Sequence, residues 1–321
     1  MKAVFCEKLG TPDDLVLREI DPPGPPGPTE LKVWLNARGV AFTDVLMAAG
    51  EYQVKPELPF VVGGEGAGVV TEVGSKVAGF SVGDRVLCPG GCVEQVLVDE
   101  SRVTRLPDNV DFEPAAAFRA NYATGLYGLQ RGRLKPGETL LVHGAAGGVG
   151  LAAVDLGKHL GATVIATAST EEKRTVALEM GADHAIDYTY GFREKVKALT
   201  GGRGADVIYD PVGGDVFDES MRCIAPFGRI LIVGFTSGRA ALAKTNHLLV
   251  KDAELIGFTI GALARHDPAW MQRNADELMS LLAAGRIRPY ISHVLPLEKT
   301  AEALNLIRER KVIGKAILTS Y

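Results

Sequence analysis

The stretch that decides the fold is Thr139-Leu140-Leu141-Val142-His143-Gly144-Ala145-Ala146-Gly147-Gly148-Val149-Gly150. Its apolar start, residues 140–142, predicts a buried strand, and residues 151–160 have helical character. The glycines between them permit a tight turn, let backbone amides approach a ligand, and let the helix pack on the sheet. A helix that begins there directs free N–H groups and its positive dipole end at an anion such as a pyrophosphate. The turn, Gly144 to Gly150, therefore predicts a dinucleotide site, with a purely structural strand-to-helix turn as the alternative.

The composition is that of an ordinary globular protein, with 46% hydrophobic and 23% charged residues over 321 positions. This length predicts two domains. The net charge is −4 and no long basic run occurs, which argues against nucleic acid as a partner. No apolar run approaches the ~20 residues that cross a bilayer, so we expect no membrane association. Four scattered cysteines, and an N-terminus that resembles a first strand rather than a signal peptide, predict a reducing, cytoplasmic setting.

The chain changes character near residue 112. Before it, short strands alternate with glycine turns, beginning with a hairpin of Lys2–Glu7 and Leu15–Ile20, which predicts a small barrel-like β domain. After it, strands and helices alternate, which predicts a parallel, doubly wound α/β sheet. The final strand, Gly314–Thr319, is expected to rejoin the first domain. We therefore predict a β-barrel domain from residues 1–120 and 265–321, and a Rossmann domain from residues 121–264.

The residues after the second strand of the α/β half indicate which nucleotide is bound. A carboxylate usually lies there in NAD sites, but here the strand ends at Ala168-Ser169. Ser169 leaves room for a 2′-phosphate, and Lys173-Arg174 can supply positive charge, so we predict NADPH. Glu171-Glu172 are interpreted as complementing the helix dipole, with ribose binding as the alternative. Tyr188 packs on the adenosine, contacts the phosphate, or is a structural rim aromatic.

Several further motifs occur in one order along the whole chain. They are Met1-Lys2-Ala3-Val4, Gly64-Glu65-Gly66-Ala67-Gly68, Val82-Gly83-Asp84-Arg85-Val86, Asn121-Tyr122-Ala123-Thr124 and Gly314-Lys315-Ala316. Together with the glycine turn, they resemble the zinc-independent quinone oxidoreductases of the medium-chain dehydrogenase/reductase superfamily. The resemblance implies a co-chaperonin-like barrel joined to a Rossmann domain, with NADPH in the cleft. It also implies a homodimer that reduces a small-molecule electron acceptor, either a quinone or an activated carbon–carbon double bond.

The residues do not supply the zinc ligands of the metal-dependent relatives. Those relatives carry a Gly-His-Glu motif, whereas the matching triplet here is Gly63-Gly64-Glu65. The region that should contain the first ligand cysteine, residues 39–44, contains none. Cys88 and Cys92 are four positions apart, with no further pair, and are interpreted as ordinary thiols near a turn. We therefore predict no metal, which disfavours alcohol oxidation and favours reduction of a conjugated acceptor.

The resemblance assigns roles to individual residues. It places Tyr52 by the nicotinamide, either as a donor to the substrate oxygen or as a rim aromatic, and Thr124 by the carboxamide. It places Ser169, Lys173 and Tyr188 at the 2′-phosphate. The remaining cofactor contacts that it implies come from Gly234, Phe235, Thr236, Phe258 and Thr259.

Two positions depart from this pattern and leave the substrate open. Ala41 replaces an asparagine of many relatives, which weakens the case for small quinones. Arg119 either faces the cleft, where it can bind an anionic group, or is an exposed helix arginine. The alternative functions are therefore an enoyl-thioester reductase and an NADPH-binding protein with little activity. The apolar strand Glu254–Phe258 is the expected dimer edge.

Overall fold

The computed structural model describes residues 1–320, and the chain divides into two compact units. One contains Met1–Arg119 together with the segment from Pro289 onward, and the other contains Ala120–Arg288. The return of the C-terminal segment to the first unit agrees with the sequence-based expectation. The second unit extends past the predicted boundary at residue 264, because the Gln130 side chain hydrogen-bonds Trp270 Nε1 (2.9 Å) and Asn274 Nδ2 (2.9 Å).

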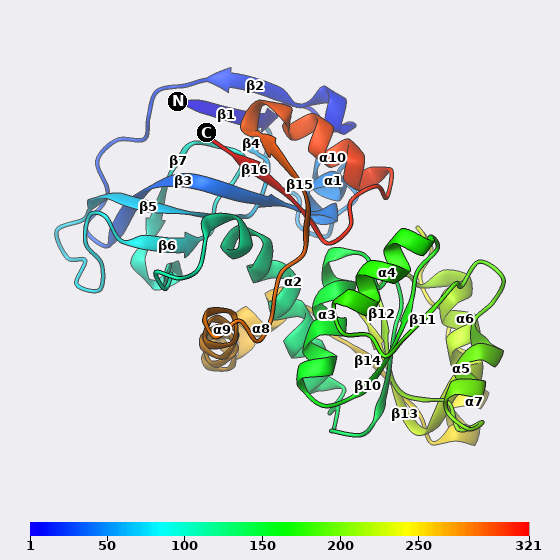
Figure 1. The fold of residues 1–321 in the computed structure, drawn as a ribbon. Coiled ribbons are helices and arrows are strands. Elements are labelled where there is room, and N and C mark those ends of the chain that lie inside the picture. Colours follow the sequence, from blue (N-terminus) through cyan, green and yellow to red (C-terminus); the bar gives the residue numbers. More distant parts are fainter. Residues whose placement is uncertain (321) are drawn as a thin grey trace. The chain divides into compact units, whose positions relative to one another are not determined.

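The first unit is built from two mostly antiparallel sheets (Figure 1). Its larger sheet has the order β15-β16-β3-β5-β6-β8, with β7 also paired to β3, and its smaller sheet has the order β2-β1-β4. The elements are β1 (Lys2–Cys6), β2 (Val16–Glu19), β3 (Glu30–Val40), α1 (Phe42–Ala48), β4 (Phe60–Val61), β5 (Glu65–Val73), β6 (Arg85–Cys88), β7 (Gln95–Asp99), β8 (Thr104–Arg105), β15 (Ile291–Pro296), α10 (Thr300–Arg308) and β16 (Lys315–Thr319). The predicted hairpin is confirmed as β1 and β2, which pair from Lys2↔Glu19 to Phe5↔Val16.

A buried apolar core explains the long strand β3. Alternate β3 side chains at Leu31, Val33 and Leu35 are completely buried and pack with Val70 of β5 and Val86 of β6. Strand β6 was not predicted, because glycines just before it gave that segment the composition of a turn.

The second unit is a doubly wound parallel sheet, as predicted. Its order is β11-β10-β9-β12-β13-β14, and every neighbouring pair is parallel. Helices α3 and α4 cover one face, and α5, α6 and α7 cover the other (Figure 1). The strands are β9 (Thr139–Val142), β10 (Thr163–Thr167), β11 (His184–Ile186), β12 (Ala205–Asp210), β13 (Ile224–Ile232) and β14 (Glu254–Gly257). The helices are α3 (Gly148–His159), α4 (Glu171–Glu179), α5 (Arg193–Leu199), α6 (Gly214–Cys223), α7 (Thr245–Lys251), α8 (Ile260–His266) and α9 (Pro268–Ala283), while α2 (Phe112–Arg131) runs from the first unit into the second.

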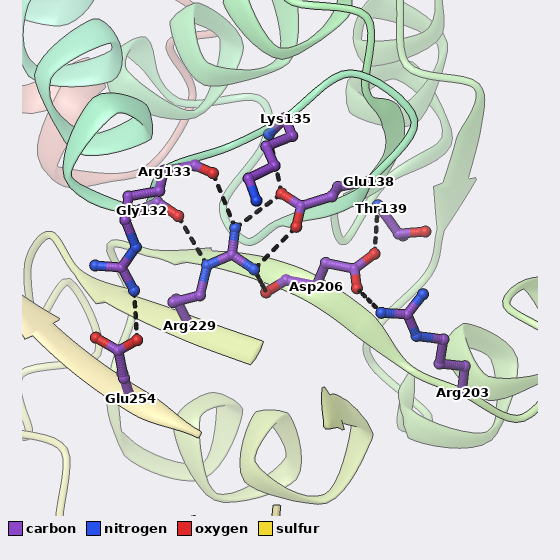
Figure 2. Close-up of polar contacts among 9 residues, drawn as sticks. All are labelled: Gly132, Arg133, Lys135, Glu138, Thr139, Arg203, Asp206, Arg229 and Glu254. Carbon is purple, nitrogen blue, oxygen red and sulfur yellow. Dashed lines mark hydrogen bonds and ion pairs between the residues drawn. The ribbon is translucent and has the colours of Figure 1, made fainter. Parts of the chain in front are cut away.

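A single arginine organises the amino-terminal ends of these strands (Figure 2). Arg229 of β13 donates to the carbonyls of Gly132 (2.8 Å), Arg133 (3.1 Å) and Asp206 (3.3 Å). It also pairs with the carboxylate of Glu138 at 2.8 Å. These bonds fix the connection from α2 to β9 and lie at the edge opposite the glycine-rich turn. Their role is therefore structural.

Candidate functional site

The glycine-rich turn lies at the carboxyl end of β9. Gly144 has φ +55°, a left-handed conformation that suits glycine, and its carbonyl accepts the N–H of Gly147 at 2.9 Å. The N–H of Ala145 donates to the carbonyl of Thr167 at 3.1 Å, which ties the turn to the neighbouring strand β10. Gly147 is the N-cap of α3. The predicted strand, turn and helix are therefore all present.

Two glycines at the start of α3 permit close approach of the backbone. A Cβ on Gly150 would lie 2.2 Å from the Gly144 carbonyl oxygen and 2.9 Å from Ala145 Cα. A Cβ on Gly148 would lie 2.5 Å from the Asn121 side-chain amide on α2. The first turn of α3 is thus held directly against the loop, and its N-cap, Gly147, is exposed. This arrangement fits a dinucleotide pyrophosphate.

A buried histidine supports the base of this turn. His143 is completely buried, with Nδ1 3.0 Å from Thr167 Oγ1 and Nε2 2.8 Å from Ser220 Oγ. Because the Ser220 hydroxyl donates to the Val216 carbonyl, it accepts the hydrogen bond from Nε2–H, and Nδ1 then accepts a hydrogen bond from the Thr167 hydroxyl. Burial lowers the pKa of His143 to about 3, so the ring is neutral and structural.

The residues predicted to contact the 2′-phosphate follow the next two strands. Ser169 lies just after β10, and Lys173 lies in the first turn of α4, whose N-cap Thr170 accepts the Lys173 N–H at 3.3 Å. Arg174 forms a 3.4 Å ion pair with Asp187, after β11. Tyr188, the next residue, is half-buried against the core behind the sheet. The sheet thus brings these residues to the same edge as the glycine-rich turn.

The remaining predicted contacts of this unit follow β13 and β14. The loop Gly234–Thr236 is held by a 3.0 Å bond from the Thr236 N–H to the Pro211 carbonyl. Phe258 stacks edge-to-face on Tyr127, with ring centroids 5.5 Å apart, and Thr259 caps α8. Both residues therefore have packing or capping roles independent of any ligand.

The last two predicted residues belong to different units. Thr124 is on α2 in the second unit, where its hydroxyl donates to the Ala120 carbonyl at 2.7 Å. Tyr52 lies in the first unit, half-buried in the loop between α1 and β4. Each unit is thus seen to carry some of the expected residues.

Asp210, at the carboxyl end of β12, was missed by sequence reasoning. Its Oδ1 accepts the N–H groups of Val212 (2.8 Å) and Gly213 (3.0 Å), and burial raises the pKa of its carboxyl group. Asp-Pro-Val-Gly-Gly directly after an apolar strand is a turn signal that could have indicated it.

The first unit contains a buried charge cluster that was also missed. Glu65, at the start of β5, forms an ion pair with Lys315, at the start of β16, and both side chains are at most 6% exposed. Gly39 faces this pair, because a Cβ there would lie 2.7 Å from Glu65 Oε1 and 2.8 Å from Lys315 Cε. Asp44 of α1 is also buried, which raises its pKa to about 6, although its carboxylate accepts the Ala41 N–H at 2.8 Å.

Two of the cysteines have the chemistry of ordinary buried thiols. Cys88 and Cys92 are buried, and burial raises the pKa of each thiol to about 12. Within residues 1–320, no group of three or more histidine, cysteine and acidic side chains is arranged to hold a metal ion. No helix in the same range is both long enough and apolar enough to span a membrane.

Comparison with known proteins identifies the family. Residues 27–108 match the profile described as alcohol dehydrogenase GroES-like domain, and residues 148–279 match the one described as zinc-binding dehydrogenase. The quinone oxidoreductase-like protein 2 homolog of Nematostella vectensis is 40% identical over 99% of this chain and 89% of its own length. A 2-haloacrylate reductase from a Burkholderia species is 35% identical over 98% of both chains.

A solved structure agrees with these matches. The Escherichia coli quinone oxidoreductase complexed with NADPH superposes with a TM-score of 0.91, at 31% identity, over 99% of this chain and 100% of that one. The GroES-like and Rossmann-like units together define a medium-chain dehydrogenase/reductase. Within that superfamily, the chain belongs to the quinone oxidoreductase family of oxidoreductases.

Proposed function

We propose that this protein is a zinc-independent, NADPH-dependent reductase of quinones or α,β-unsaturated carbonyl compounds. The observation that carries this proposal is the exposed N-cap of α3, Gly147, beside a turn that the close approach of Gly150 to the Gly144 carbonyl holds in place. The NADPH of the E. coli relative and the reductase activity named for the Burkholderia relative support the cofactor and the acceptor class.

The chain's own residues would hold each part of the cofactor. The N–H groups at the start of α3 would bind the pyrophosphate, and the loop Gly234–Thr236 would lie under the nicotinamide ribose. Ser169, Lys173 and Tyr188 would surround the 2′-phosphate. Bound NADPH supplies a hydride to the acceptor. Tyr52 would donate a hydrogen bond to the acceptor oxygen, on which negative charge develops.

The metal-free part of the proposal rests on residue identity. Gly64 lacks the imidazole that the resemblance places at this position in zinc-dependent relatives, and Lys315 neutralises the neighbouring Glu65. Cys88 and Cys92 are buried thiols whose raised pKa values disfavour the thiolate that zinc requires. Activity that survives exhaustive chelation is the expected result, and activity restored only by added zinc would contradict it.

The reaction can be tested by NADPH oxidation against a panel of quinones, enals and enoyl-CoA thioesters. We expect turnover with at least one quinone or unsaturated carbonyl acceptor. Tight NADPH binding without turnover of any acceptor would instead indicate the alternative of a cofactor-binding protein with little activity.

Cofactor preference has its own test at Lys173. Lys173→Glu places negative charge where the 2′-phosphate is expected, so the KM for NADPH should rise much more than the KM for NADH. NADH serves as the internal control because it lacks that phosphate. Equal changes for both cofactors would refute the assignment.

A homodimer and a cytoplasmic location complete the proposal. Strand β14 is an edge of the six-stranded sheet, and an unpaired edge is stabilised by a partner strand. The nearby α7 side chains Leu249 and Val250 are about 80% exposed, as expected for residues that a second copy covers. Light scattering at micromolar concentration should give the dimer mass, and a monomer mass would exclude this arrangement.

A further inference from the structure

Asp210, the last residue of β12, is a buried carboxylate whose bonds shape the loop that follows it. Its Oδ1 accepts the N–H groups of Val212 (2.8 Å) and Gly213 (3.0 Å), which closes the chain into a tight turn. We call residues 211–213 the Asp210 loop. Because both N–H groups converge on one oxygen, removing that oxygen would release the loop from β12.

The Asp210 loop lies against the glycine-rich turn. A Cβ built on Gly144 would lie 3.5 Å from both Pro211 Cγ and Val212 Cγ2. The strands that carry the loop and the turn, β12 and β9, are neighbours in the sheet, and the His143 N–H donates to the Tyr209 carbonyl at 3.0 Å. The loop therefore has a fixed place beside the turn proposed to bind the pyrophosphate.

The same loop carries the segment proposed to lie under the nicotinamide ribose. The Thr236 N–H donates to the Pro211 carbonyl at 3.0 Å. The next N–H, that of Ser237, donates to the Val212 carbonyl at 3.0 Å. A Cβ on Gly234 would lie 3.4 Å from the Pro211 carbonyl oxygen. Since β12 lies between β9 and β13 in the sheet, the Asp210 loop joins the two proposed cofactor segments.

We propose that Asp210 is a positioning residue that sets the nicotinamide end of NADPH relative to the pyrophosphate. This inference rests on the proposed function, because it concerns the cofactor of the same reductase. Two carbonyls of the Asp210 loop hold the backbone of residues 236 and 237, so a shift of the loop would move the ribose that this backbone supports. A displacement of about 1 Å at a reacting centre can lower a rate about 100-fold.

The adenosine end of the cofactor depends on other elements. The residues proposed for the 2′-phosphate come after β10 and β11 and are Ser169, Lys173 and Tyr188. Strand β9 separates β10 and β11 from β12 in the sheet. The glycine-rich turn is also tied to β10, because the Ala145 N–H donates to the Thr167 carbonyl at 3.1 Å. Within residues 1–320, the Asp210 side chain hydrogen-bonds only the two N–H groups of its own loop, so a ligand without the nicotinamide should bind independently of it.

Cofactor fragments separate positioning from general destabilisation. NADP⁺ contains both ends of the cofactor, whereas 2′,5′-ADP contains the adenosine and the 2′-phosphate but no nicotinamide. Both are titrated calorimetrically into wild type, Asp210→Ala and Asp210→Asn. We expect Asp210→Ala to weaken NADP⁺ binding about tenfold or more. The dissociation constant of 2′,5′-ADP should change less than about twofold.

Asp210→Asn is the conservative variant that should restore function. It keeps an acceptor oxygen at Oδ1, and Oδ2, which it replaces, has no hydrogen-bond partner within residues 1–320. Its NADP⁺ affinity should therefore lie within about threefold of wild type. Loss of NADP⁺ affinity in Asp210→Asn equal to that in Asp210→Ala would overturn the role of the two N–H bonds.

Turnover gives a second measurement. At saturating NADPH and acceptor, Asp210→Ala should lower kcat about tenfold or more, and Asp210→Asn should restore it. A lower melting temperature with unchanged kcat and unchanged NADP⁺ affinity would show that Asp210 is only structural, and would overturn the proposal. If wild type turns over no acceptor, the reductase proposal fails, while the fragment titrations still decide the role of Asp210.

Asp206→Ala is the matched control, because Asp206 lies at the opposite end of the same strand (Figure 2). Its buried carboxylate also accepts a backbone N–H, that of Thr139 at 2.8 Å, and pairs with Arg203. This variant should lose stability but keep the wild-type ratio of NADP⁺ affinity to 2′,5′-ADP affinity. An equal change of that ratio in Asp206→Ala and Asp210→Ala would mean a general effect of destabilisation and overturn the proposal.

Gly213→Ala decides the question if Asp210→Ala does not fold. Gly213 has φ +70°, and a Cβ there would lie 2.8 Å from the Arg239 carbonyl oxygen. The added methyl group would push the Asp210 loop away from the segment after β13 while Asp210 itself stays in place. NADP⁺ affinity and kcat should fall and 2′,5′-ADP affinity should hold. Unchanged NADP⁺ affinity and kcat would refute the positioning role of the loop.

Discussion

Because His143 is neutral in the folded protein, the free energy of unfolding should fall as the pH is lowered. Replacing this histidine should remove that part of the pH dependence. The ring is completely buried, and its pKa falls from 6.5 to about 3 in the folded protein. The unfolded chain therefore binds one more proton than the folded chain between these values. The stabilising effect is present above about pH 6.5 and is lost as the pH falls toward 3.

The two pKa values set the size of the effect. Between pH 7 and pH 5, protonation of the unfolded histidine lowers the free energy of unfolding by about 2 kcal/mol. Asp44 works in the opposite direction, because its raised pKa of about 6 favours the folded state as the pH falls. The wild-type curve alone therefore mixes two opposing contributions, and a comparison between variants is required.

Urea unfolding of wild type and His143→Gln at pH 7 and pH 5 isolates the histidine, since the Asp44 contribution is common to both. His143→Gln is expected to lower the free energy of unfolding at pH 7. At pH 5, the difference in the free energy of unfolding between wild type and variant should be about 2 kcal/mol smaller than at pH 7. His159→Gln, at an exposed position, is the control and should show no such change. A stability difference for His143→Gln that is the same at both pH values would refute the buried neutral ring.

Three further substitutions test the structure. Arg229→Met should lower the free energy of unfolding by about 3–5 kcal/mol in urea titrations, because it strands the Glu138 carboxylate and several carbonyls. Arg133→Ala breaks an ion pair with Glu254 in which both side chains are exposed, and should cost less than about 1 kcal/mol. Equal losses in the two variants would show that the Arg229 network contributes no more to stability than an exposed ion pair does. Gly150→Ala should weaken NADPH binding about tenfold or more in fluorescence titrations, because its Cβ would displace the turn. Unchanged affinity would contradict the assignment of the glycine-rich turn as the pyrophosphate site. Gly39→Ala should lower the melting temperature and reduce the free energy of unfolding by about 1–3 kcal/mol or more. An unchanged melting temperature would mean that the Glu65–Lys315 ion pair can move to make room for the added methyl group.

The sequence predicted the second unit well because its signals are local. The apolar run before the glycines, the turn itself and the helix after it are contiguous, and β9 and α3 form where the pattern indicated. The extent of the unit was harder to predict. Gln130 fastens α9 to this unit through side-chain bonds to Trp270 and Asn274, more than a hundred residues away, and no periodic pattern records such a contact.

The residues of the candidate site also divide into those that a local sequence pattern indicates and those that it does not. The glycine-rich turn and Ser169 could be found because each follows a recognisable strand. The Glu65–Lys315 pair could not, because its members are 250 positions apart and each is a single charge in an apolar stretch. Arg119 was left with two interpretations, an anion-binding residue that faces the cleft or an exposed helix arginine, and the structure shows that its side chain is partly buried.

The pairing of β16 between β15 and β3 has a consequence for how the protein is made. The nucleotide-binding unit is one uninterrupted segment, so it can fold while the ribosome is still adding the residues from 289 onward. The other unit must wait for them. At ordinary rates of synthesis, the nascent chain would carry an incomplete sheet, with Glu65 still lacking its cation, for roughly 2–7 s. During that interval, the open edge of β3 is the part of the chain that most needs protection from aggregation.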